Sequence, residues 1–211
     1  MRFAFSFLLL FVSLFASAQF LQDVGGKPYL QNASEEYEGS PLLFKAWVKA
    51  DVTTAGGKVY KDMLVNVDLQ QDLPIFQREG KVFTFSEQIN EFTISDGTAK
   101  MVFKRGASVS PSLPNVLMEV ISETPFVLKK HERNVVEVPS YGGSTKSFRY
   151  AENKSYYAAI DDGFKKITLS KESAEKLFSK QWKETEEYAK KNNISFKTED
   201  GWRKLGLYQP K

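Results

Sequence analysis

The chain contains one histidine, His131, and a Ser-His-Asp hydrolase would have to use it as the general base. His131 lies among the basic residues Lys129, Lys130 and Arg133, which disfavour the charged form of the imidazole. The surrounding sequence is typical of an exposed strand end or turn. We therefore expect a solvated surface histidine and no nucleophilic triad.

Acidic residues offer a second chemistry, because a pair of carboxylates can hydrolyse a glycosidic bond. The candidates form three groups: Glu35, Glu36 and Glu38; Asp62 with Asp68; and Asp161 with Asp162. Each group also has a structural explanation. The first suits a polar loop, the second the solvent face of a strand, and the third a hairpin turn. A carboxylate-dependent hydrolase is therefore the lowest of three functional hypotheses.

The chain lacks the residues that other catalytic and cofactor chemistry requires. The chain has no cysteine, which excludes thiol catalysis, cysteine-bound zinc and iron–sulfur clusters. A single histidine leaves too few donors for an ordinary zinc site. No EF-hand loop and no glycine-rich phosphate loop occurs. The sequence predicts neither a cofactor nor a metal.

Aromatic residues gather on both sides of the glycine-containing segment 139–145 and in the residues that follow. They suit a core that joins the last strands to C-terminal helices. They also suit a surface on which a sugar or an apolar ligand stacks. The candidate ligand-binding residues are Tyr141, Tyr150, Tyr156, Tyr157 and Trp182.

These residues must be positioned by a sheet, since residues 42–169 follow the two-residue period of β-strands. In the segment 58–69, apolar and polar side chains alternate between two faces, as in a half-buried antiparallel strand. The pairs Asp96-Gly97 and Asp162-Gly163 predict hairpin turns, the type I′ turn being the one that Asp-Gly favours. We predict a mainly β (α+β) fold: residues 19–169 form an antiparallel meander that can curve into a half-barrel.

After residue 169 the period becomes helical. Ser170 suits an N-cap, and apolar residues then recur at steps of three and four up to Ala189. Asn192-Asn193 suits a left-handed helix end, and a shorter helix is predicted from Thr198 to near Gly206. Segment 170–211 is thus predicted to be a helical hairpin packed on the sheet.

The first eighteen residues have the pattern of a secretory signal peptide. Arg2 precedes an apolar run, and Ala16-Ser17-Ala18 suits cleavage before Gln19. No cysteine follows to take a lipid anchor, and no later apolar run has bilayer length. We expect an exported chain, periplasmic or extracellular, with no membrane span after cleavage.

Charge argues against nucleic acid as a partner. The net charge is +3, and the modest excess of lysine and arginine lies after Thr145, where it suits a solvated helix face. Nucleic-acid binding needs a denser basic patch. We therefore expect no nucleic-acid partner.

Two sets of motifs resemble a known group of proteins. Gly57-Lys-Val-Tyr60 leads into Met63-Leu-Val-Asn-Val-Asp68, and Ser155-Tyr156-Tyr157 with Asp162-Gly163 precedes Leu177-Phe178 and the run Tyr188–Phe196. On these motifs the chain resembles small exported β-rich proteins of Bacteroidetes-type bacteria. The motifs are turns and core positions without catalytic residues. The resemblance implies export and a β-rich body with C-terminal helices.

The leading functional hypothesis is a non-enzymatic, exported binding or interaction protein of the cell envelope. Its partner would be an envelope protein, a glycan or an apolar ligand. The alternative is a periplasmic carrier of lipid or another apolar ligand, because a curved meander with helices against it can enclose a groove. The carboxylate-dependent hydrolase follows these two.

Overall fold

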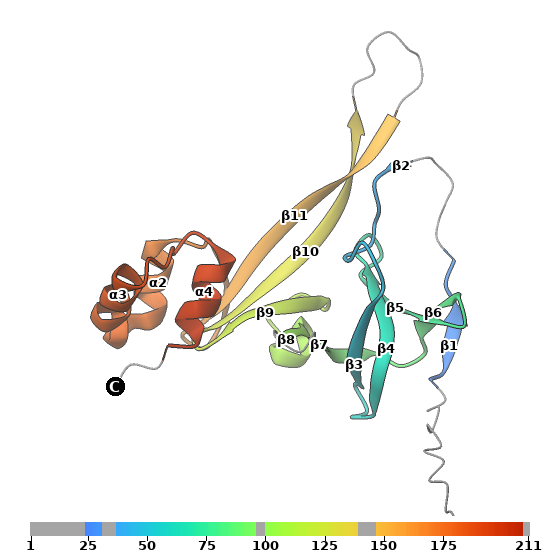
Figure 1. The fold of residues 1–211 in the computed structure, drawn as a ribbon, viewed down its shortest axis with the longest axis horizontal. Coiled ribbons are helices and arrows are strands. Elements are labelled where there is room, and N and C mark those ends of the chain that lie inside the picture. The colour runs from blue at the N-terminus through green and yellow to red at the C-terminus, as the bar shows by residue number, and fades with distance from the viewer. Residues whose placement is uncertain (1–23, 31–36, 96–99, 139–146, 209–211) are drawn as a thin grey trace, which may run out of the picture.

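A computed structural model describes residues 24–30, 37–95, 100–138 and 147–208. The expected signal peptide, Asp96-Gly97 and Tyr141 lie outside these residues. Within them the fold is mainly β, with one open, largely antiparallel sheet and C-terminal helices (Figure 1), as predicted. The sheet does not close into a barrel.

The strands follow the chain in this order: β1 (Gly26–Pro28), β2 (Tyr37–Glu38), β3 (Val48–Thr54), β4 (Val59–Asp68), β5 (Leu73–Arg78), β6 (Lys81–Phe85), β7 (Ile89–Ser95), β8 (Lys100–Arg105), β9 (Leu117–Glu123), β10 (Phe126–Val138), β11 (Ser147–Ile160) and β12 (Gly163–Ile167). The helices are α1 (Gly106–Val109), α2 (Lys171–Phe178), the short 3-10 helix η1 (Ser179–Gln181), α3 (Trp182–Lys191) and α4 (Glu199–Gly206).

Two meanders share strand β3. Strands β3 to β6 lead away from one edge of β3, and β1 pairs with β6. Strand β7 then pairs with the other edge of β3, and β7 to β12 follow one another across the sheet. The antiparallel meander is thus confirmed, with one addition: the chain returns to β3 before it continues. The only parallel pairing in the described residues joins β2 to β11.

One row of directly paired residues crosses the sheet from β4 to β12. Side chains paired in this way lie on the same face. The row consists of Tyr60, Val52, Phe92, Phe103, Glu119, Lys129, Tyr156 and Ile167. Its first half is apolar and belongs to the core of the curved N-terminal strands. It becomes charged at β9 and β10, where helix α4 covers the same face.

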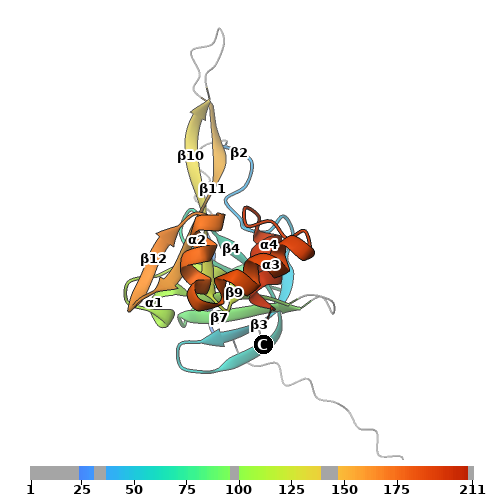
Figure 2. The same cartoon turned by 90° about the vertical axis from the view of Figure 1, so that its left-hand side faces the viewer.

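Two further cores hold the C-terminal half together. Helices α2, α3 and α4 cover one face of β9 to β11 (Figure 2), where Trp202, Leu205 and Ala158 are fully buried. On the opposite face, Met118 and Leu128 pack under the segment that contains α1. Adjacent residues of one strand therefore enter different cores.

The predicted helix ends are confirmed, but the first helix is interrupted. The Ser170 side chain accepts a hydrogen bond from the Ser173 N–H, and Thr198 caps α4 in the same way through Gly201. Ser179 has a φ of 43°, which breaks the expected stripe into α2, η1 and α3. None of the helices in the described part of the chain has the length and apolar character needed to cross a bilayer.

Candidate functional site

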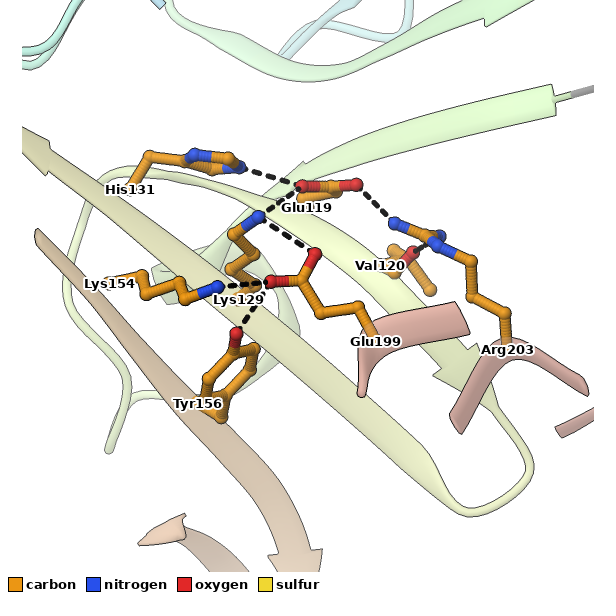
Figure 3. A network of polar contacts seen from close by, with 8 residues as sticks. All are labelled: Glu119, Val120, Lys129, His131, Lys154, Tyr156, Glu199 and Arg203. Atoms are coloured by element: carbon orange, nitrogen blue, oxygen red, sulfur yellow. Dashed lines mark hydrogen bonds and ion pairs between the residues drawn. The ribbon is translucent and has the colours of Figure 1, made fainter. Parts of the chain in front are cut away.

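A buried carboxylate lies where helix α4 meets the sheet. Glu119 of β9 has a side chain that is 4% exposed, and three basic side chains converge on it (Figure 3). His131 Nε2 lies 2.7 Å from Oε2, and Lys129 Nζ lies 3.6 Å from the same oxygen. Arg203 of α4 pairs with Oε1 and also donates to the Val120 carbonyl oxygen at 3.1 Å.

A second carboxylate reaches the same cluster from the first turn of α4. Glu199 accepts hydrogen bonds from Lys129 at 2.9 Å, Lys154 at 2.9 Å and the Tyr156 hydroxyl at 2.6 Å. Lys129 therefore bridges the two carboxylates. Lys129 is paired directly with Glu119 of β9 on one side and with Tyr156 of β11 on the other, which places its side chain between the two carboxylates.

The partners determine the ionisation of both acids. Burial alone would raise the pKa of Glu199, but the hydrogen bonds from Tyr156, Lys129 and Lys154 outweigh it and lower the pKa to about 2. Burial likewise disfavours ionised Glu119, but the hydrogen bond with His131 and the charge of Lys129 hold its pKa below the ordinary value. Burial, followed by the hydrogen bond to Glu199, raises the pKa of the Tyr156 hydroxyl to about 12.

This cluster has the properties of a structural junction. A carboxylate pair that cleaves glycosides needs one protonated acid, and both acids here are ionised and surrounded by donors. The contacts join strands β9, β10 and β11 to helix α4. We name these residues the α4 junction: Glu119, Lys129, His131, Lys154, Tyr156, Glu199 and Arg203.

The expectation of an exposed His131 at a strand end is wrong. The residue lies within β10, its side chain is 11% exposed, and its ring centroid is 6.1 Å from that of Phe103. The reason is that β10 continues to Val138, so His131 lies in the middle of the strand. Its side chain is on the face that α4 covers, where it meets Glu119.

The expectation that Asp68 lies on the solvent face of a strand is wrong. Only 1% of the residue is exposed. Its carboxylate accepts hydrogen bonds from the Tyr29 hydroxyl at 2.6 Å, from Gln71 Nε2 at 2.7 Å and from the Gln70 N–H at 2.8 Å. Asp68 therefore closes the β4–β5 turn, in the manner of an aspartate that bonds to the backbone two residues ahead.

The other acidic candidates do not converge either. Asp161 and Asp162 are exposed and form the β11–β12 turn, in which Asp161 has a φ of 53°. Gly163 already belongs to β12, so the turn lies one residue before the predicted Asp162-Gly163 pair. Asp62 is exposed at a bulge of β4, and Glu38 is exposed in β2. Glu35 and Glu36 lie outside the described residues. Among the residues that the structure describes, no group of histidine and acidic side chains is arranged to hold a metal ion.

The predicted aromatic residues occupy separate places. Tyr150 packs against Tyr37 and donates to Gln70. Tyr156 belongs to the α4 junction, whereas Tyr157 lies in the core on the opposite face. Trp182 packs on Phe196 among the helices. These four residues do not line one surface.

A groove lies beside the last strand of the sheet. Strand β12 is terminal in the strand order, so one edge of it pairs with no described strand. Helix α2 lies beside β12 (Figure 2). A groove of about 570 Å³ is lined by residues of both elements. Its lining combines two isoleucines, two hydroxyl side chains and three lysines: Ile160, Ile167, Thr168, Ser173, Lys165, Lys166 and Lys176. We name it the β12 groove.

The lysines of the β12 groove differ in their partners. Lys165 pairs with Asp161 at 3.0 Å, and both side chains are well exposed. No ion pair joins Lys166 or Lys176 to another residue that the structure describes. The groove therefore presents positive charge above an apolar floor formed by Ile160 and Ile167.

Sequence reasoning missed both the α4 junction and the β12 groove. A signal for the first was present, since Glu119 interrupts the apolar run Leu117–Ile121 and a buried charge needs a partner. The groove had no comparable signal, because it depends on how α2 packs beside β12.

Comparison with known proteins identifies no relative: no family model, no curated protein and no solved structure matches the chain. The resemblance to small exported proteins therefore stays a prediction.

Proposed function

We propose that the protein is an exported, non-enzymatic binding protein of the cell envelope that recognises acidic ligands in the β12 groove. The observation that carries the proposal is the combination of an open strand edge, an apolar floor and lysines without acidic partners. Ligand sites typically have volumes of roughly 300–1,000 Å³ and a few polar groups that fix orientation. The groove, at about 570 Å³, agrees with both properties.

The arrangement of the acidic residues supports binding over hydrolysis. Glu119 and Glu199 are held ionised by basic partners, and the Asp68 carboxylate accepts hydrogen bonds within the β4–β5 turn. The open sheet likewise favours a surface groove over the enclosed interior that a barrel-like lipid carrier would use.

The test compares two double variants of the purified protein. Lys166→Gln with Lys176→Gln removes charge from the groove. Lys49→Gln with Lys81→Gln removes the same charge from exposed positions on β3 and β6. Binding of poly-glutamate, phosphatidylglycerol vesicles and dextran is measured for each protein by light scattering or fluorescence.

We expect at least one acidic probe to bind, with about tenfold weaker binding for the groove variant, which corresponds to about 1.4 kcal/mol. The control variant should match the wild type. The proposal fails if no probe binds, or if both variants weaken binding equally. Export has its own test: N-terminal sequencing of the protein released by the cells should begin at Gln19.

A further inference from the structure

We propose that the β12 groove takes an extended acidic segment of a partner protein, which adds to β12 as a further strand. The inference rests on the proposed function, because it names the class of ligand for the same groove. Strand addition obtains affinity from main-chain hydrogen bonds and specificity from alternate side chains of the added segment. Three features of the groove support it.

The first feature is the hydrogen bonding along the outer edge of β12. The Phe164 N–H donates to the Ser112 side chain at 3.4 Å, and so points away from β11. Along an antiparallel strand, the N–H and C=O groups of every second residue point to the same side. The N–H and C=O of Lys166 therefore point to the open edge, two residues beyond the Phe164 N–H that Ser112 accepts from.

The second feature is charge. Lys166 and Lys176 have no acidic partner among the described residues, and they come from the two sides of the groove. Lys165 is held only by an exposed pair with Asp161, and exposed pairs contribute about 0–1 kcal/mol. All three lysines are thus available to the carboxylates of an incoming segment.

The third feature is the apolar floor. Ile160 and Ile167 are half-buried, and both are on the face of the sheet that the helices cover. Successive side chains of an added strand point to opposite faces. A segment that alternates apolar and acidic residues can therefore place apolar side chains toward these isoleucines and carboxylates on the opposite face, beside Lys166. Lys165 and Lys176 lie on the isoleucine face and add positive charge there.

These features favour a polypeptide over a lipid headgroup or free phosphate. An anion can accept from the lysines and from the Lys166 N–H. An ionised carboxylate has no donor for the Lys166 carbonyl. Hydrogen phosphate and a glycerol headgroup carry hydroxyl donors, but not in a row that matches the strand. A peptide backbone supplies both a donor and an acceptor at alternate residues.

The experiment measures the binding of an eight-residue capped peptide of alternating glutamate and leucine to the purified protein. A second peptide has the same sequence with alternate amides N-methylated, so that one edge cannot donate hydrogen bonds. A third has lysine in place of glutamate. Phosphatidylglycerol vesicles and inorganic phosphate are titrated in parallel, and the protein variants are K166Q with K176Q and K49Q with K81Q.

We expect the first peptide to bind, and N-methylation, lysine substitution and the groove variant each to weaken its binding at least tenfold. The K49Q and K81Q control should have no effect. All four lysines are exposed, so we expect both variants to fold. Far-UV circular dichroism checks this.

Two results overturn strand addition in distinguishable ways. If N-methylation has no effect, or if only vesicles or phosphate bind in a manner that depends on Lys166 and Lys176, the peptide inference fails and the proposed function stands. If no probe shows binding that depends on these lysines, both fail.

Discussion

Replacing Glu119 by glutamine tests whether the α4 junction stabilises the fold. The side chain is 4% exposed and faces His131, Lys129 and Arg203. Removing one partner of a buried ion pair typically costs about 3–5 kcal/mol. Lys129 keeps Glu199 as a partner, and the Arg203 side chain is 34% exposed, so we expect the lower end, about 3 kcal/mol.

The matched control is Glu152→Gln, which makes the same chemical change on β11. The Glu152 side chain is 59% exposed and pairs with Arg133 at 2.7 Å. Exposed pairs contribute little, so this variant should lose less than about 1 kcal/mol. The free energy of unfolding is measured by urea titration followed by far-UV circular dichroism.

Thermal unfolding gives an independent check of the same pair of variants. For a chain of about 200 residues, 1 kcal/mol corresponds to about 2–4 °C in Tm. Glu119→Gln should therefore lower Tm by about 6–12 °C. The reasoning is refuted if this variant lies within about 1 kcal/mol of the wild type, or if Glu152→Gln costs as much.

Three further predictions concern stability. Because the folded-state pKa of Glu199 is about 2, its contribution of about 2–3 kcal/mol is complete above about pH 5 and is lost as the pH falls toward 2. The stability difference between wild type and Glu199→Gln should therefore shrink over this range, and a constant difference would contradict the assignment. Gly201→Ala should cost about 2 kcal/mol in urea titrations, because the added Cβ would lie 1.8 Å from the Ser195 oxygen, whereas Gly163→Ala meets nothing within 4 Å and should cost less than about 1 kcal/mol. Equal losses would exclude this steric explanation. Ser122→Ala should raise the free energy of unfolding by about 1 kcal/mol, because the buried Ser122 hydroxyl has no hydrogen-bond partner; a loss of stability would show that the hydroxyl is satisfied in solution.

Local patterns predicted the fold class and the helix ends. Alternation along β4 predicted a strand, and Ser170 and Thr198 predicted helix starts, because each depends on residues close in sequence. The return of β7 to β3 and the break at Ser179 were not predictable in this way. The return of β7 depends on pairing between distant segments, and no residue type near Ser179 marks the break.

The candidate site was less predictable than the fold. Tyr156 and Tyr157 are adjacent in a strand and so must point to opposite faces, a rule that already excluded one shared platform. Glu119 and Glu199 are 80 residues apart, and only packing of α4 on β9 and β10 brings them to Lys129. The β12 groove likewise requires α2 to lie beside β12, which no local pattern specifies.

Amide hydrogen exchange at Lys166 tests the central claim most directly. Its N–H points to the open edge of β12 and should exchange rapidly in the free protein. Saturation with the alternating acidic peptide should slow this exchange at least tenfold, with no change at Lys49 or Lys81. Unchanged exchange at Lys166 in the presence of bound peptide would contradict recognition by strand addition in the β12 groove.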